Sequence, residues 1–178
     1  IEKSSKIKWV IIHHTLWDYD TSLEWVQKIY AFHAISRQWW DIWYNYLIWD
    51  DWEIYEWRAG WDYAVWAHSI WNNRWTIWVA VIGNYSNKKI NEKQQKSLQN
   101  LVSNLIEKYD IDVTKKFDYH KECIARECPL ALESKKLDAI VGHRDSGHTS
   151  CPWDALYEQI HEINDKFLEI VKRSKEEK

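Results

Sequence analysis

Two apolar, β-rich segments constrain the fold of this chain more than any other feature of its sequence. Residues 7–13 read IKWVIIH, and residues 76–83 read TIWVAVIG. Short apolar runs rich in β-branched residues are typical of buried strands. Because segments with helical periodicity are interspersed with these strands, the chain predicts an α/β fold in which helices cover a sheet.

Three helices are predicted from spacing and capping patterns. The sequence Thr21-Ser22-Leu23-Glu24 is a capping box that opens the first helix. Residues on one stripe of that helix are Val26, Ile29, Tyr30, His33 and Arg37. Asn91 caps the second helix, whose apolar face consists of Leu98, Leu101, Val102, Leu105 and Ile106. The third helix begins at Asp154, and its inner face consists of Leu156, Ile160, Ile163, Phe167 and Val171.

Shorter strands and irregular segments account for much of the remaining chain. Residues 44–48 and 53–57 predict a strand pair joined by the turn WDDW. Residues 114–136 are polar and predict an irregular insertion, followed by a strand over 137–142. The charged residues 172–178 predict a frayed helix tail.

Length and charge exclude several classes of protein. A chain of 178 residues is expected to form a single domain over residues 1–178, here as a monomer. The net charge of −3, with both signs interspersed, provides no broad basic surface for nucleic acid. No apolar run approaches the length that spans a bilayer, so we expect no membrane span.

Histidines and a cysteine follow two of the predicted strands. His13 and His14 end the first strand, while His143 and Cys151 lie in VGHRDSGHTSCPWD, residues 141–154. A catalytic zinc site needs three such ligands and one open position for water. Because successive strand residues point to opposite faces, only one of His13 and His14 is expected to reach the metal. The alternative is that these are ordinary loop histidines and a buried thiol.

Four motifs resemble, in order, those of the type 2 N-acetylmuramoyl-L-alanine amidases, a family that includes the peptidoglycan recognition proteins. They are WVIIHHT, DIWYNYLI, AHSIWNNRWTIWVAVIGNY and VGHRDSGHTSCPWDALY, between residues 7 and 157. The resemblance implies a mixed central β-sheet flanked by helices, with a zinc-bearing groove. It implies hydrolysis of the amide between the lactyl group of N-acetylmuramic acid and L-alanine in peptidoglycan.

The resemblance also implies roles for individual residues. His13, His143 and Cys151 match the family's zinc ligands, and Tyr44 and Thr149 match residues that assist catalysis. Positions expected to contact a muramyl peptide in the groove are His33, Arg37, Trp39, Asn45, His68 and Asn73.

Two other functions remain open beside a zinc hydrolase. A recognition module of the same family would hold muramyl peptide without cutting it, but recognition members commonly lack the zinc cysteine that matches Cys151. A zinc-stabilised structural domain would need a fourth protein ligand to close the site.

Two further cysteines bear on the compartment. Cys123 and Cys128 lie in YHKECIAREC. A disulfide that cross-links the irregular insertion is a simpler interpretation of this pair than a metal site with His120. Such a disulfide would require an oxidising compartment, so we expect an extracytoplasmic protein.

The balance of glycine and tryptophan is abnormal, with 4 Gly and 15 Trp, where about 12 Gly would be usual for this length. Trp stands where the family carries Gly at Trp43, Trp52, Trp57, Trp66, Trp71, Trp75, Trp78 and Trp153, and also at Trp49 and Trp61. UGA encodes Gly in some bacteria and Trp in other lineages. We therefore hypothesise that many of these tryptophans are misread glycines; a chain made as printed should fold poorly and have a crowded groove.

The mass of the protein from its natural host tests this hypothesis. Each Gly in place of a Trp lowers the mass by the difference between an indolylmethyl group and a hydrogen atom. We expect an intact mass below that of the printed sequence by a whole multiple of this difference. A mass equal to that of the printed sequence would contradict the hypothesis.

Overall fold

The computed structural model describes residues 7–16, 22–38, 41–49, 51–57, 75–120, 134–147 and 149–176. The strands are β1 (Trp9–His14), β2 (Tyr46–Ile48), β3 (Ile54–Glu56), β4 (Thr76–Val81), β5 (Phe117–His120), β6 (Ser134–Leu137) and β7 (Ile140–Gly142). The helices are α1 (Ser22–Tyr30), the π-helix η1 (Ala31–Ser36), α2 (Glu92–Tyr109), α3 (His143–Ser146) and α4 (Asp154–Glu176).

A mixed central sheet organises the chain, in the order β3-β2-β4-β1-β7. The central strand pairs, β1 with β4 and with β7 and β2 with β4, are parallel, whereas β3 runs antiparallel to β2. Every residue of β1 and β4 is buried. The predicted α/β fold and its two buried apolar strands are therefore confirmed.

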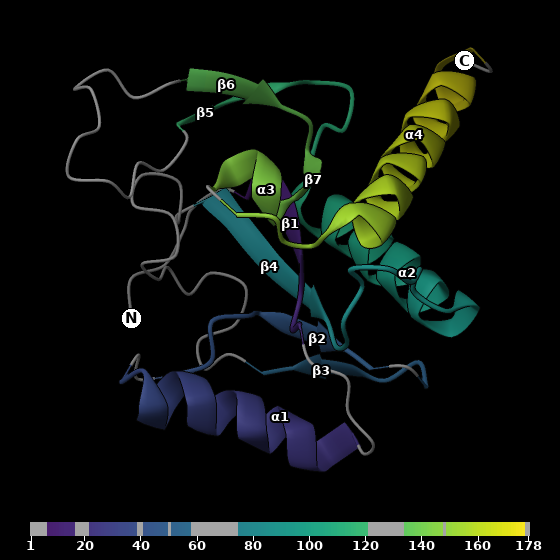
Figure 1. Cartoon of the computed structure of the whole chain (residues 1–178). Coiled ribbons are helices and arrows are strands. Elements are labelled where there is room, and N and C mark those ends of the chain that lie inside the picture. Colours follow the sequence, from purple (N-terminus) through teal and green to yellow (C-terminus); the bar gives the residue numbers. More distant parts are fainter. Residues whose placement is uncertain are drawn as a thin grey trace.

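Helices cover both faces of this sheet (Figure 1). Val10 and Ile12 of β1 belong to one apolar cluster with residues of α2 and α4. On the opposite face, Leu47 and Ala80 pack with residues of α1. Because side chains alternate along a strand, His13 lies on the face of α1 and His14 on the face of α2 and α4.

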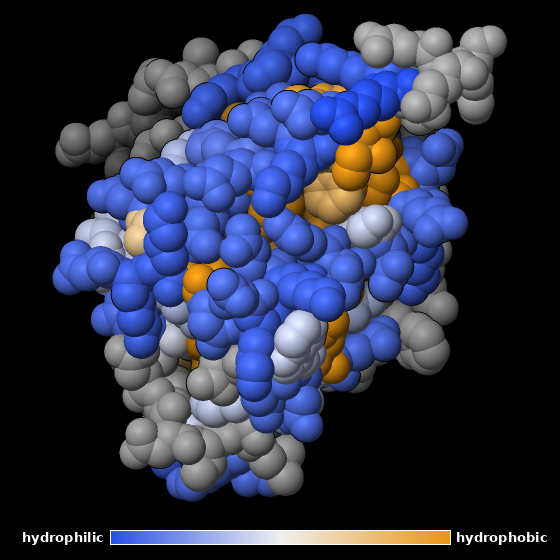
Figure 2. Space-filling view, turned by 90° about the vertical axis from the view of Figure 1, so that its right-hand side faces the viewer, coloured by the Kyte–Doolittle hydropathy of each residue, from blue (hydrophilic) through white to orange (hydrophobic). Residues whose placement is uncertain are grey.

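The two long helices follow their predicted patterns. Asn91 accepts a hydrogen bond from the backbone N–H of Gln94 at 2.8 Å, and the Gln94 side chain accepts one from the backbone N–H of Asn91 at 3.2 Å. This reciprocal cap starts α2 at the predicted place. Figure 2 shows the face that α2 and α4 cover, which is largely hydrophilic except for an apolar area near the C-terminal end of α4. Within the described residues, no helix is both long and apolar enough to cross a membrane.

The first helix departs from its prediction. The α-helical hydrogen bonding ends at Tyr30, and residues 31–36 form a π-helix in which the Arg37 N–H donates to the Phe32 carbonyl at 2.9 Å. The wider turn buries His33, whereas Arg37 remains exposed with its guanidinium 5.0 Å from the Phe32 ring centroid. His33 and Arg37, predicted to share one stripe of the helix, therefore differ in exposure.

The segment over residues 114–136 is more regular than predicted. Its two ends form the antiparallel strands β5 and β6, with Phe117 opposite Leu137 and Asp118 opposite Lys136. The single strand predicted over 137–142 is divided between β6 and β7. Residues 172–176, predicted as the tail of a helix, continue α4.

Two of the anomalous tryptophans adopt backbone angles that suit glycine. Trp52 has φ +88° and Trp153 has φ +68°. A positive φ is uncommon for residues with a Cβ and costs about 1–3 kcal/mol. Trp78 differs, because it lies inside β4 with its indole buried. The backbone geometry at Trp52 and Trp153 thus supports the hypothesis of misread glycines.

Substitution of Trp52 by Gly and by Ala separates backbone strain from loss of the indole. Both variants remove the ring, but only Gly relieves the positive φ. We expect Trp52→Gly to exceed Trp52→Ala in free energy of unfolding by about 1 kcal/mol, measured by denaturant titration. The same pair at Trp57, which lacks a positive φ, should show the reverse order; Ala above Gly at both positions would contradict the strain.

Candidate metal centre

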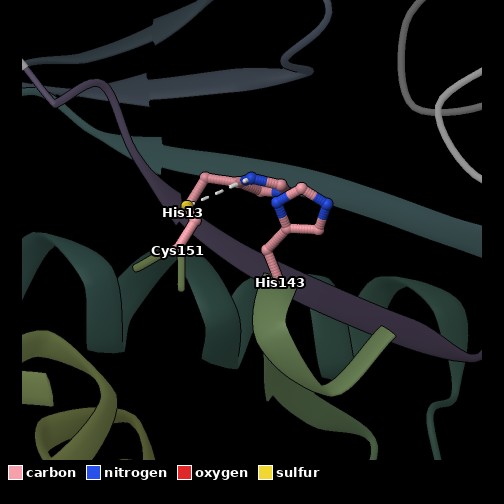
Figure 3. A group of neighbouring side chains, drawn as sticks. All are labelled: His13, His143 and Cys151. Atoms are coloured by element: carbon pink, nitrogen blue, oxygen red, sulfur yellow. Dashed lines mark hydrogen bonds between the residues drawn. The ribbon is translucent and has the colours of Figure 1, made fainter. Parts of the chain in front are cut away.

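Three candidate ligands come together at the carboxyl ends of β1 and β7. His13 lies near the end of β1, His143 follows β7 directly, and Cys151 lies in the loop before α4. Their ligand atoms all lie within 4.8 Å of one another, and the Cys151 Sγ is 3.7 Å from the His13 Nδ1 (Figure 3). Two imidazoles and one thiol at this separation could hold a single metal ion.

The neighbouring His14 takes no part in this group. Its Nδ1 accepts a hydrogen bond from the backbone N–H of Tyr85 at 3.4 Å, on the opposite face of the sheet. Burial, with a smaller contribution from the charge of Arg144, lowers the pKa of His14 to about 4. His13, and not His14, therefore lies with His143 and Cys151.

Burial sets the protonation of the candidate ligands. It lowers the pKa of His143 to about 4, so this imidazole is neutral near neutral pH and has a lone pair for a metal. Burial also raises the pKa of the Cys151 thiol to about 12. A divalent cation would reverse the second effect, because its charge stabilises the thiolate that binds it.

Aromatic side chains surround His13. The Trp78 ring stacks on the His13 ring with centroids 4.0 Å apart, and it lies 5.1 Å from the His143 ring. The Tyr44 ring lies 5.4 Å from His13 and 5.5 Å from His33. An indole thus packs against two candidate ligands, which agrees with the crowding expected if Trp replaces Gly at position 78.

Tyr44 is a candidate hydrogen-bond donor to substrate. Burial, together with the nearby Cys151, raises the pKa of Tyr44 above its usual range. The phenol therefore stays protonated near neutral pH. The backbone N–H of the preceding Trp43 donates to the His33 Nδ1 at 3.4 Å, which ties the residue before Tyr44 to the π-helix.

Other predicted site residues take different positions. Thr149 is exposed, and its Oγ1 accepts a hydrogen bond from the Cys151 N–H at 3.2 Å. Asn45 is buried; its Oδ1 accepts from the Trp78 N–H at 2.9 Å, and its N–H donates to the Trp78 carbonyl at 2.9 Å. Asn45 therefore bonds both backbone groups of a β4 residue, a role that residue patterns alone did not reveal.

Several predicted residues lie outside the described part of the chain. They are Trp39, His68 and Asn73 of the expected groove, His148 of the ligand loop (residues 143–151), and the cysteines of the expected disulfide, Cys123 and Cys128. Sequence reasoning also gave no role to Arg144, Asp145 and Tyr157, which hydrogen bond around the ligand loop. The sequence did contain a signal that could have identified them, because all three belong to the motif that contains His143 and Cys151.

Comparison with known proteins defines the class. The family described as N-acetylmuramoyl-L-alanine amidase matches residues 3–154, and the chain belongs to this family. Peptidoglycan-recognition protein SC2 of Drosophila melanogaster is 30% identical over 128 residues, which cover 69% of this chain and 68% of that protein. The N-acetylmuramoyl-L-alanine amidase of Homo sapiens is 26% identical over 135 residues, which cover 76% of this chain and 19% of that protein.

Solved structures agree with this assignment. The amidase LysC from Clostridium intestinale URNW matches with a TM-score of 0.65 and 25% identity, covering 91% of this chain and 85% of that chain. Drosophila peptidoglycan recognition protein SD matches with a TM-score of 0.69 and 20% identity, covering 90% and 83%. Both amidases and recognition proteins therefore share this fold.

Metal titration tests the three-residue group. We expect the chain to bind one zinc ion and Cys151→Ser to weaken the affinity by more than the roughly 10–100-fold that follows loss of a ligand's hydrogen-bond partner. Affinity should rise with pH, because binding releases the Cys151 proton. Competition with a chelator measures both effects. Ser150→Ala, which changes an exposed neighbour, should leave the affinity unchanged; equal loss in both variants would contradict the assignment.

Proposed function

We propose that this protein hydrolyses the amide bond between N-acetylmuramic acid and L-alanine in peptidoglycan, using zinc held by His13, His143 and Cys151. The observation that carries this proposal is the convergence of these three ligand atoms within 4.8 Å of one another. Two neutral imidazoles and one thiolate suit zinc, and three protein ligands leave one position for water or substrate. Membership of the amidase family supports the same reaction.

The chain's own residues would divide the work of this reaction. When bound, zinc supplies a Lewis acid that polarises the scissile carbonyl and lowers the pKa of a water molecule toward about 7. His143, which burial keeps neutral, and His13 would bind it through ring nitrogens. Tyr44, beside His13 and protonated, donates a hydrogen bond to the carbonyl oxygen as negative charge develops there. In other enzymes one such donor is worth about 10²–10³ in rate.

Thr149 has a smaller part in the proposal. Its Oγ1 already accepts the Cys151 N–H, so its hydroxyl proton remains available for donation toward the substrate. The same hydrogen bond shapes the turn that presents the Cys151 thiol. Its position on the exposed side of the ligand loop would let it approach a bound muramyl peptide.

Recognition without cleavage is the second candidate function. Several similar proteins are named peptidoglycan-recognition proteins, and one similar structure, at 28% identity and a TM-score of 0.67, is the ectodomain complex of recognition proteins LCa and LCx bound to tracheal cytotoxin. The presence of Cys151 beside His13 and His143 favours hydrolysis, because binding a peptide alone needs no thiol. In either case we propose an extracytoplasmic location and peptidoglycan as the partner.

A peptidoglycan-release assay separates the two functions. Removal of zinc by a chelator should abolish release of stem peptides with a new L-alanine amino terminus, and added zinc should restore it. Binding of muramyl peptide with no cleavage at any zinc load would instead establish the recognition module.

Replacement of Tyr44 tests the catalytic step. Tyr44→Phe keeps the ring but removes the donor, so we expect kcat to fall by about 10²–10³ with zinc affinity unchanged. Tyr55→Phe is the matched control, because Tyr55 packs against the same apolar cluster while its hydroxyl bonds Glu53. Full activity in Tyr44→Phe would remove Tyr44 from the mechanism.

A further inference from the structure

Two of the three candidate ligands lie on one short segment, residues 143–151, which we call the ligand loop. His143 begins it and Cys151 ends it. The backbone N–H of Arg144 donates to the Cys151 carbonyl at 2.7 Å, so the residue after one ligand is bonded to the other ligand. The separation of the two ligands therefore depends on what keeps this loop closed.

The Arg144 side chain closes the loop from outside. Its Nη2 donates to the Ser150 carbonyl at 2.8 Å, and its Nη1 donates to the Asp154 carboxylate at 2.7 Å. These acceptors lie on either side of Cys151 in the chain. Because Asp154 is exposed, its ion pair with Arg144 by itself contributes little to stability. The planar guanidinium matters because it joins a loop carbonyl and the first residue of α4 at once.

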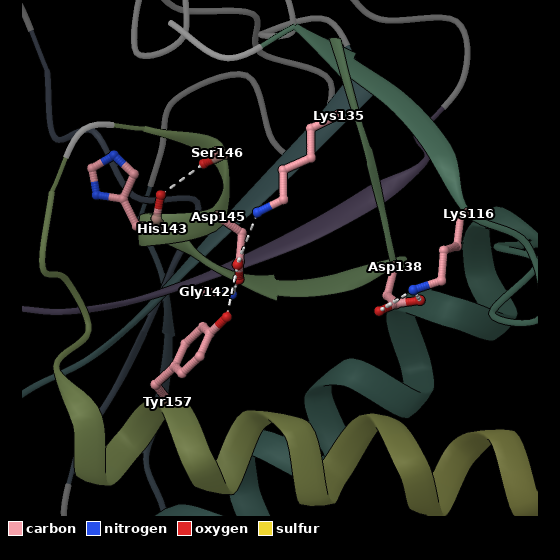
Figure 4. Close-up of polar contacts among 8 residues, drawn as sticks. All are labelled: Lys116, Lys135, Asp138, Gly142, His143, Asp145, Ser146 and Tyr157. Carbon is pink, nitrogen blue, oxygen red and sulfur yellow. Dashed lines mark hydrogen bonds and ion pairs between the residues drawn. The ribbon is translucent and has the colours of Figure 1, made fainter. Parts of the chain in front are cut away.

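Asp145 fixes the other end of the loop. Its Oδ2 accepts the backbone N–H of Gly142, the residue before His143, at 3.1 Å. Its Oδ1 accepts the Tyr157 hydroxyl at 2.7 Å (Figure 4). The Asp145 side chain is only 12% exposed, with the Lys135 Nζ 3.9 Å away. The start of the loop is thus attached to α4 by a largely buried, charge-assisted hydrogen bond.

Tyr157 is the point at which these contacts meet. The Arg144 guanidinium carbon lies 4.5 Å from the centroid of its ring. The ring also packs against Gly142, where an added Cβ would meet the Tyr157 Cδ2 at 2.8 Å. Burial, with the Asp145 hydrogen bond, raises the pKa of Tyr157 to about 12. Its hydroxyl therefore remains a donor near neutral pH.

We propose that Tyr157, acting through Asp145 and Arg144, is the positioning residue that preorganises the ligand loop for metal. This inference rests on the proposed zinc site. The phenol donates to the Asp145 carboxylate, which accepts the Gly142 N–H, and the Arg144 N–H donates to the Cys151 carbonyl, so their effect passes through the backbone beside His143 and Cys151. The loop then holds both ligands at binding separation before the metal arrives, which lowers the conformational entropy lost on binding.

Zinc affinity of Tyr157→Phe tests the proposal. Phe keeps the packing on Gly142 and Arg144 but loses the hydroxyl. We expect zinc affinity to fall by about 10–100-fold, with apo secondary structure unchanged by circular dichroism. Arg144→Gln should also weaken binding. Lys116→Gln is the control, because it breaks the exposed Lys116–Asp138 pair (3.1 Å) elsewhere in Figure 4 and should leave affinity unchanged.

A double-mutant cycle tests the route through Asp145. Tyr157→Phe and Asp145→Asn disrupt the same hydrogen bond, so their effects on zinc affinity should be strongly non-additive. The absorption spectrum of the cobalt-substituted variants should change as the ligand geometry loosens. A general loss of stability alone would produce neither this non-additivity in zinc affinity nor a changed cobalt spectrum.

The failures of the two proposals are distinguishable. Unchanged zinc affinity in Tyr157→Phe, additive effects in the cycle, or a lower kcat at unchanged affinity would overturn the positioning role and leave the proposed zinc site standing. An unsubstituted chain that binds no zinc would overturn both. Zinc binding without cleavage would contradict the proposed hydrolysis alone.

Discussion

The parallel pairing of β1 with both β4 and β7 brings the two halves of the candidate metal centre together. Ile12 pairs with Gly142, so His13 and His143, which follow these two residues, lie at the same edge of the sheet. The carboxyl ends of parallel strands meet at one edge, which is where open α/β sheets carry their sites. Only long-range strand pairing can unite His13 with residues 130 positions or more away, near the far end of the chain.

Burial then decides how the united residues behave. It keeps the His143 imidazole neutral and the Cys151 thiol protonated, so the group lacks negative charge until a cation arrives. The nearby Tyr44 phenol is held protonated for the same reason. One physical cause therefore prepares the His143 nitrogen ligand, a proton-releasing sulfur ligand and a hydrogen-bond donor beside them.

Tryptophan at glycine positions affects strand and turn differently. At Trp52 and Trp153 the backbone has positive φ, so the cost is local strain. At Trp78 the backbone is extended within β4, and the indole occupies space beside two candidate ligands. Glycine at position 78 would leave that space beside His13 and His143 unfilled by this side chain.

The sequence by itself determined the buried strands, the Asn91 cap, the family and the candidate ligands, because periodicity, capping chemistry and motif order are local properties of a chain. The tertiary structure brought His13 together with His143 and Cys151, placed a buried His33 in a π-helix, and bonded Asn45 to the backbone at Trp78. It also paired the ends of a segment that reads as irregular. These outcomes depend on contacts between residues distant in the chain, which no local pattern specifies.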